Sequence, residues 1–325
     1  FRYDGTSRLI SSKRWGGFPS FSAGWRLSEE NFMKSLDLSW LNNLKLRGSY
    51  GELGNQNIGL YPYQAMLSLT SNYSFDNATL SSGVAQTALN YENIMWETTK
   101  VLDFGFDLTA FQGLNINFDW YQKTTADILW DTQVTGVVGL LPPTINNGTM
   151  KNKGFELSVN YQNNVKSGYF TGLNYSAGFN IDHYKNKLVK FGAKQISGYN
   201  LRQEGEEWDA FYMIEQIGIF QSTQEIASSP KQYNDATVPG DLKFRDANGD
   251  GKINDDDRVI IKGRYPALNY SFNLSANWKG FDLSAQFQGV YKVKYYVDGW
   301  GTIPFVQGTP PTTNWRNRWT ETNPS

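Results

Sequence analysis

The sequence predicts an all-β protein, a transmembrane antiparallel up-and-down β-barrel. Three observations lead to this prediction. Apolar and polar residues alternate strictly over long stretches, short turns alternate with long loops, and the polar members of each stretch are mainly Asn, Gln, Ser and Asp. A period of two places alternate side chains on opposite faces of a sheet, so each stretch has one apolar and one polar face.

The alternation is clearest in two segments that flank a tight turn at Lys279–Gly280. Their apolar residues are Leu268, Tyr270, Phe272, Leu274, Ala276, Trp278, Phe281, Leu283, Ala285 and Phe287. The residues between them are almost all Asn, Ser, Gln or Asp. The two segments therefore predict a long antiparallel hairpin.

The same period recurs in six earlier segments, which brings the expected strands to eight. These segments cover residues 21–27, 44–50, 102–108, 114–120, 155–161 and 173–181. No stretch with a helical period extends beyond a few turns, although the connection 28–43 has room for a helical turn.

The connections between these segments differ in length. Short turns are expected at Gln112–Gly113, Asn163–Gly168 and Lys279–Gly280, and long loops rich in Gly, Asn and Ser at 54–97, 131–153 and 185–265. Two strands and one short turn separate each long loop from the next, so an up-and-down sheet collects the long loops at one end. Transmembrane barrels have this asymmetry, with the long loops extracellular.

A soluble β-sandwich also alternates, but its strands usually have about 5–6 residues, against about 9–11 in a transmembrane barrel. The segment Leu268–Trp278 has the longer form, and its Asn- and Ser-rich face suits a wet lumen. Aromatic residues near the expected strand ends predict interfacial girdles: Trp25, Trp120, Trp130, Trp278 and Tyr291. Together these features favour the membrane barrel.

Composition excludes several classes of function. Lys and Arg number 30 and Asp and Glu 31, with no basic stripe, which argues against a nucleic-acid partner. The absence of cysteine excludes disulfides and a thiol nucleophile, and the single His183 makes a His-rich metal site or a Ser–His triad improbable. No apolar run approaches the roughly 18 residues of a membrane helix.

An acidic run, Glu204, Glu206, Glu207 and Asp209, is the only feature that suggests a glycoside hydrolase. Glycosidases need two carboxylates that flank one bond at a defined distance, and consecutive loop residues do not indicate that. We interpret the run as a solvated loop face and expect no enzymatic activity.

The segment Asp246–Asp257 has oxygen-bearing side chains at the spacing of an EF-hand loop. The expected ligands are Asp246, Asn248, Asp250, Lys252 through its carbonyl, Asn254 and Asp257. Gly251 stands where that loop bends sharply, and Asp257 stands where it usually has Glu. We expect a structural Ca²⁺ or Mg²⁺ here; a solvated acidic turn is the alternative.

Aromatic residues in the long loops could stack on sugar rings, although such residues more often pack a loop against itself. The candidates for substrate contact are Tyr61, Tyr63, Trp208 and Trp300, with Tyr73 and Phe75 as further loop aromatics.

Five strings carry a family resemblance. They are SWLNNLKLRGSYGELGNQ (39–56), NYENIMWETTKVLDFGFDL (90–108), GTMKNKGFELSVNY (148–161), GIFQSTQEI (218–226) and PGDLKFRDANGDGKINDDDRVIIKG (239–263). With them the chain resembles the C-terminal part of the barrel of SusC/RagA-type TonB-linked (TonB-dependent) outer-membrane transporters. It departs from that pattern in EGEEWDAFYMIEQIGIF, where the family usually has more glycine.

The resemblance implies a fragment of a 22-stranded, plugged barrel, multi-pass in the outer membrane of a Gram-negative bacterium and in contact with its lipid. It implies active import of nutrient oligosaccharides or peptides, a SusD-like lipoprotein at the extracellular mouth, and energy from the TonB complex. The signal peptide, the plug and the TonB box that the family carries are not found in these residues, and the lack of an initiator Met also suggests a larger protein.

One alternative from another class stays open. A secreted or surface calcium-binding β-sheet adhesin, or a carbohydrate-binding protein without transport, would also combine alternating strands with a cation loop. The two differ in whether the apolar face contacts lipid.

Overall fold

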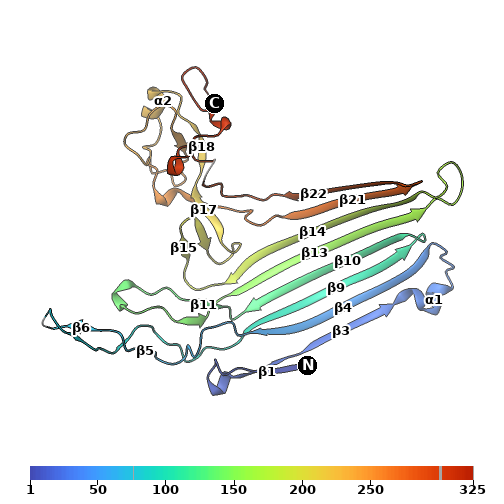
Figure 1. Cartoon of the computed structure of the whole chain (residues 1–325), viewed down its shortest axis with the longest axis horizontal. Helices are drawn as coiled ribbons and strands as arrows, with labels where there is room; N and C mark the ends of the chain where they lie inside the picture. The colour runs from blue at the N-terminus through green and yellow to red at the C-terminus, as the bar shows by residue number, and fades with distance from the viewer. Residues whose placement is uncertain (76, 300–301, 325) are drawn as a thin grey trace. The chain divides into compact units, whose positions relative to one another are not determined.

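The computed structural model describes residues 1–75, 77–299 and 302–324. Eight long strands form one antiparallel sheet in the order β22-β21-β14-β13-β10-β9-β4-β3 (Figure 1). Their bounds are β3 Ser20–Arg26, β4 Leu41–Asn55, β9 Glu97–Ala110, β10 Leu114–Ala126, β13 Thr149–Asn164, β14 Asn174–Lys190, β21 Leu268–Trp278 and β22 Phe281–Tyr291. Every strand pairs with its predecessor in this set, so the eight predicted strands and their up-and-down order are confirmed.

The remaining strands are short and lie in the connections. They are β1 Arg2–Gly5, β2 Trp15–Phe18, β5 Leu67–Ser68, β6 Tyr73–Ser74, β7 Leu80–Ser81, β8 Ala85–Gln86, β11 Leu129–Asp131, β12 Thr144–Asn146, β15 Gln195–Ser197, β16 Asn200–Arg202, β17 Ala210–Ile214, β18 Gln216–Ile219, β19 Leu242–Phe244 and β20 Arg258–Ile261. The helices are α1 Asn31–Lys34, α2 Thr223–Ala227 and the 3-10 turns η1 Ser11–Lys13, η2 Leu27–Glu29, η3 Gly136–Val138, η4 Asp255–Asp257, η5 Val306–Gly308 and η6 Thr313–Asn317. Among the described residues no helix is long and apolar enough to span a membrane.

Several strands extend beyond the predicted bounds. β13 begins at Thr149 and β14 continues to Lys190, so the ends of the expected loops 131–153 and 185–265 are strand. The backbone ladder continues here although Lys and Asn interrupt the apolar alternation. The connection between β13 and β14 is longer than the predicted turn, because β14 begins only at Asn174.

The two ends of the sheet differ as predicted. α1 lies at one end, and β5, β6 and β11 lie at the other (Figure 1). α1 lies within the connection 28–43, so the predicted helical turn there is confirmed.

The chain divides into two compact units. The first, the sheet unit, comprises Phe1–Ala193, Gln203–Glu207 and Ala267–Tyr291. The second, the loop unit, comprises Lys194–Arg202, Trp208–Pro266 and Lys292–Ser325.

In the sheet unit, large apolar side chains of the long strands stay exposed. They include Phe21, Leu46, Phe104, Tyr270, Phe272, Leu274, Leu283 and Phe287. A small cluster outside the sheet strands is buried: Leu9, Ile58 and Ile94, with Tyr63 and Trp96 packed against it. The sheet itself is therefore one layer thick, with no second layer over its apolar face among the described residues of this unit.

The loop unit has a core of its own. β15, β16, β17 and β20 form a four-stranded antiparallel sheet, and β18 pairs with β19. The buried apolar side chains are Leu201, Ala210, Phe211, Phe220 and Ile253. Arg264 donates a hydrogen bond to the Asn200 side chain over 2.5 Å, which joins the two ends of this segment. The sequence did not predict this compact fold within the loop 185–265.

Candidate functional site

The polar face of the eight-stranded sheet carries hydrogen bonds between side chains of neighbouring strands. Ser176 and Ser275 hydroxyls lie 2.7 Å apart, and the Asn180 amide donates to the Ser271 hydroxyl over 3.2 Å. The Asn269 amide donates to the Asp182 carboxylate over 2.8 Å. These pairs arise because the strand register places polar residues of β14 opposite polar residues of β21. The row forms a hydrophilic wall.

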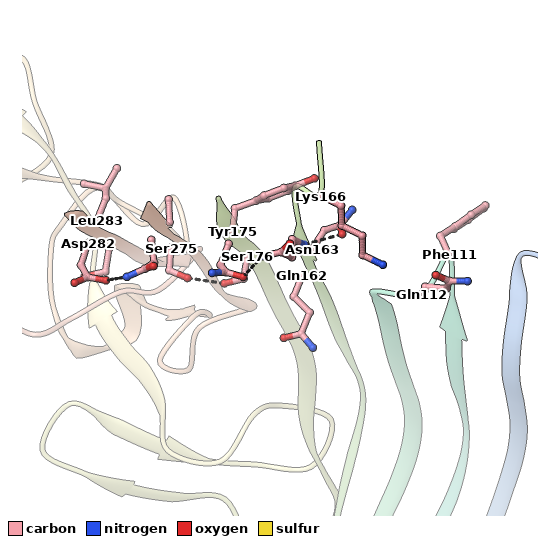
Figure 2. Close-up of a pocket in the computed structure, with 15 residues that line it drawn as sticks. Phe111, Gln112, Gln162, Asn163, Lys166, Tyr175, Ser176, Ser275, Asp282 and Leu283 are labelled. Carbon is pink, nitrogen blue, oxygen red and sulfur yellow. Dashed lines mark hydrogen bonds between the residues drawn. The ribbon is translucent and has the colours of Figure 1, made fainter. Parts of the chain in front are cut away.

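A pocket of ≈ 770 Å³ lies at the short-turn end of this wall. Its lining comes from the β9–β10 turn, the end of β13, the start of β14 and the β21–β22 hairpin, as Figure 2 shows. The polar lining residues include Gln112, Gln162, Asn163, Lys166, Ser176, Ser275 and Asp282. The Asn277 amide donates to Asp282 and fixes one side of the pocket. Its chemistry suits hydrogen bonding to a polar solute or polypeptide.

An ion-pair cluster lies on the same face across β4, β9 and β10. Arg47 Nη2 is 3.0 Å from Asp107 Oδ1, and Arg47 Nη1 is 2.9 Å from Asp119 Oδ1. The Asn117 amide also donates to Asp107 over 2.9 Å. Sequence reasoning missed this cluster, although its members occupy polar positions of alternating strands and could have been found from the register.

The predicted cation loop, Asp246–Asp257, is held by side chain-to-backbone hydrogen bonds. Asp246 accepts from the Gly249 N–H over 2.6 Å and from the Gly251 N–H over 2.8 Å. Asn248 accepts from the Asp250 N–H, and Asp250 accepts from the Lys252 N–H. Gly251 has φ of +83°, a left-handed conformation that glycine adopts without steric cost. The predicted bend at Gly251 is confirmed.

Asp257, at the end of the loop, is fully buried. Its carboxylate accepts hydrogen bonds from the Asn254 N–H over 2.8 Å, the Ala247 N–H over 2.8 Å and the Asn248 N–H over 3.4 Å. The bond from Asn254 above all, followed by those from Ala247 and Asn248, holds the pKa of Asp257 below its ordinary value. Asp257 is therefore the anchor of the loop.

The donor set of the loop consists of carboxylate, amide and carbonyl oxygens, which are the ligands of Ca²⁺ and Mg²⁺. Asp250 is exposed and Asp246 is half-buried, while Asp257 is fully buried. In the described part of the chain, no group of three or more His, Cys, Asp or Glu side chains is arranged to hold a metal ion. The cation site therefore stays a prediction.

The aromatic residues that are candidates for substrate contact belong to different units of the chain. Tyr61 and Tyr63 form an edge-to-face pair with ring centroids 6.3 Å apart, and Tyr63 also packs on the buried cluster of the sheet unit. Trp208 belongs to the loop unit, where the Arg202 guanidinium lies 4.8 Å from its ring centroid. Trp300 lies outside the described residues.

The expected aromatic girdles are only partly formed. Trp25, Trp278 and Tyr291 lie at or next to the ends of long strands. Trp120 instead lies within β10, because that strand continues to Ala126, and Trp130 lies in the short strand β11. These two predictions of position are wrong.

The acidic run is more ordered than a solvated loop face. Glu204 accepts a hydrogen bond from the Phe191 N–H over 2.8 Å, and Asp209 pairs with Arg202 at 2.5 Å. His183 lies in β14, where its Nδ1 is 2.5 Å from the Ala267 carbonyl oxygen. The acidic run and His183 therefore both make contacts within the fold.

An antiparallel, up-and-down sheet with one polar and one exposed apolar face defines the wall of a β-barrel. Comparison with known proteins gives the family: residues 1–203 match the family "TonB dependent receptor-like, beta-barrel". The chain belongs to this family.

Curated relatives agree with the assignment. TonB-dependent receptor P3 of Formosa agariphila is 32% identical over 300 residues, which cover 88% of this chain and 29% of the relative. TonB-dependent receptor SusC of Bacteroides thetaiotaomicron is 28% identical over 315 residues, or 91% of this chain and 30% of the relative.

Solved structures give the same fold. The RagAB peptide importer in its open-open state matches with a TM-score of 0.73 and 25% identity, over 98% of this chain and 34% of that chain. The closed-closed state matches with a TM-score of 0.71 and 26% identity, over 90% of this chain and 31% of that chain. This chain thus spans about a third of the length of its relatives.

Proposed function

We propose that this chain forms part of the barrel wall of an outer-membrane transporter that imports nutrients with energy from TonB. The observation that carries the proposal is the division of the sheet into two faces. Exposed aromatic and aliphatic side chains suit contact with lipid, and the hydrogen-bonded row of Asn, Ser and Asp suits a water-filled or plugged lumen. In this proposal the chain takes part in transport and catalyses no reaction.

The proposed cargo is an oligosaccharide or a peptide. The RagAB peptide importer is among the structural neighbours of this chain, and the TonB-dependent receptor SusC is among its relatives. In the proposed orientation the long connections lie outside the cell, where a SusD-like lipoprotein covers the mouth. Tyr61, Tyr63 and Trp208 are candidates for contact with the cargo from these connections.

We also propose that the loop Asp246–Asp257 binds a structural Ca²⁺ or Mg²⁺. The donors are the side chains of Asp246, Asn248, Asp250, Asn254 and Asp257 and the carbonyl of Lys252. Calcium titration of the full-length protein should give one site that is lost in Asp250→Ala and retained in Asp282→Ala, whose carboxylate lies in the sheet unit. Equal binding by the wild type and Asp250→Ala would contradict the proposed site.

The transport proposal is tested with the full-length receptor. Cells that carry it should accumulate one member of a panel of labelled glycans and peptides, and deletion of the TonB-coupling partner should abolish this uptake. The purified protein should require detergent and migrate faster on gels before heating than after. A freely soluble full-length protein would favour the adhesin or carbohydrate-binding alternative, and uptake without TonB would favour a passive pore.

A further inference from the structure

Four lysines gather on the apolar face of the sheet, near the end where the long connections lie. They form two directly opposed pairs between β13 and β14, Lys151–Lys187 and Lys153–Lys185. Residues two apart in a strand share a face, so Lys153 continues the row that contains Phe155. The lysines therefore stand at the border of the face that we assign to lipid.

Like charges in directly opposed positions destabilise a strand pair, because their Cβ atoms are only about 4.5–5.5 Å apart. Within the described chain, no acidic side chain forms an ion pair with any of the four lysines. Lys100 provides the contrast: it belongs to the same cross-strand row through Thr124, and its Nζ lies 3.3 Å from Glu52. The four lysines thus carry positive charge that no ion pair among the described residues neutralises.

The same four lysines line one pocket of ≈ 650 Å³, together with Val189, Glu204 and Gly205. The segment 203–207 borders it beyond β14, since the Gly205 N–H donates to the Leu188 carbonyl over 2.8 Å. One oxygen of the Glu204 carboxylate accepts from the Phe191 N–H. Four lysines against one glutamate leave three positive charges in excess around this concavity.

We propose that this pocket binds the phosphate-bearing headgroup of a membrane lipid. A phosphate offers several acceptor oxygens to lysine ammonium groups. The pocket also adjoins the apolar row Phe155, Leu157 and Val159 on the same face, along which acyl chains can lie. The inference rests on the proposed membrane location, which brings lipid to this face. A free phosphate would use the same charges but gain nothing from the apolar row.

The test uses the full-length receptor in nanodiscs of phosphatidylcholine with increasing phosphatidic acid, and native mass spectrometry counts the retained phosphatidic acid. Each lysine near a membrane surface contributes about a fivefold gain in affinity for anionic lipid. The double variant Lys153→Gln/Lys185→Gln should therefore bind phosphatidic acid about 25-fold more weakly. The matched control is Lys45→Gln/Lys123→Gln, which removes the same charge from the polar face of the same sheet.

Loss of binding in the pocket variant alone supports the proposal, and equal binding by the pocket variant and the wild type overturns it. A second arm adds inorganic phosphate and glycerol 3-phosphate. If either competes as effectively as phosphatidic acid, the ligand is a free phosphate and the lipid assignment is wrong. If the receptor inserts into nanodiscs but the variants bind alike, only this inference fails. If the receptor does not insert, the proposed function fails with it.

Discussion

The sheet unit and the loop unit show two ways to stabilise β-structure. In the loop unit, short strands bury Phe220, Leu201 and Phe211 in a core of protein. In the sheet unit, long strands satisfy their backbone by pairing but leave Phe272, Leu274 and Phe287 exposed. The loop unit therefore carries its own apolar environment, whereas the exposed apolar face of the sheet would contact lipid in the proposed membrane location. This contrast predicts which substitutions each region tolerates.

The largest effect is expected in the core of the loop unit. Phe220 is fully buried beneath the Lys243 ammonium group, and its replacement by Ala should cost about 3–5 kcal/mol of local stability. Hydrogen exchange of the loop unit in the full-length protein measures this. The matched change Ile217→Ala, at an exposed position of β18, should have little effect. Similar losses in both variants would mean that the loop unit lacks an independent core.

The next effect separates the two faces of the sheet. Phe272→Lys puts a charge at a mid-strand position of the apolar face and should cost about 2–4 kcal/mol in a bilayer. Asn273→Lys puts the same charge on the polar face one residue later and should be nearly neutral. Urea unfolding of the two variants in lipid vesicles, followed by gel mobility, compares their free energies of unfolding. Equal destabilisation would contradict the assignment of the faces.

A smaller, pH-dependent effect is expected at Asp257. Its pKa is lowered in the folded loop, so it stabilises the fold above its unfolded pKa, near 4. This contribution is lost as the pH falls from about 4 through the folded pKa. Protection of the Ala247 and Asn248 amides, relative to their intrinsic exchange, should therefore decrease below about pH 4. Asp257→Asn should remove this pH dependence, and unchanged protection in the wild type at pH 3 would exclude it.

The smallest effect is expected at the start of α2. The Ser222 hydroxyl accepts from the Glu225 N–H over 3.1 Å and caps the helix. Ser222→Ala should cost about 1 kcal/mol, and Ser222→Asp should retain the cap. Hydrogen exchange of residues 223–227 distinguishes the two variants, and no difference between them would mean that the cap is dispensable.

The eight long strands and their order were predictable, because a period of two over many residues fixes both the strand and its faces. The continuation of β13 and β14 was not, since Lys151, Lys153, Lys185 and Lys187 replace the apolar members of the pattern. Because the apolar pattern is interrupted there, the sequence pattern placed these lysines in the loops 131–153 and 185–265. Their pairing across β13 and β14 was therefore not predicted. A cross-strand pair depends on register, which a single segment does not reveal.

The compact fold of the loop unit was not predicted, for another reason. Its strands have only three to five residues, too few for a periodic pattern to stand out from its surroundings. The local conformation of the loop Asp246–Asp257 was predictable, because Asx turns and the bend at Gly251 depend on local sequence. Convergence of its oxygens on a cation depends on tertiary packing, which spacing alone does not determine.

The hydrogen bond from Arg264 to Asn200 has a consequence for folding kinetics. β14 and β21 are adjacent strands, yet residues 191–267 separate them along the chain. Closing so long a disordered segment has an entropic cost that grows with the logarithm of its length. If the loop unit folds first, only the residues before Asn200 and after Arg264 remain free between the two strands. The entropic barrier to their pairing then decreases by about 1–2 kcal/mol. Early folding of the loop unit would thus bring β14 and β21 close together before the sheet is complete.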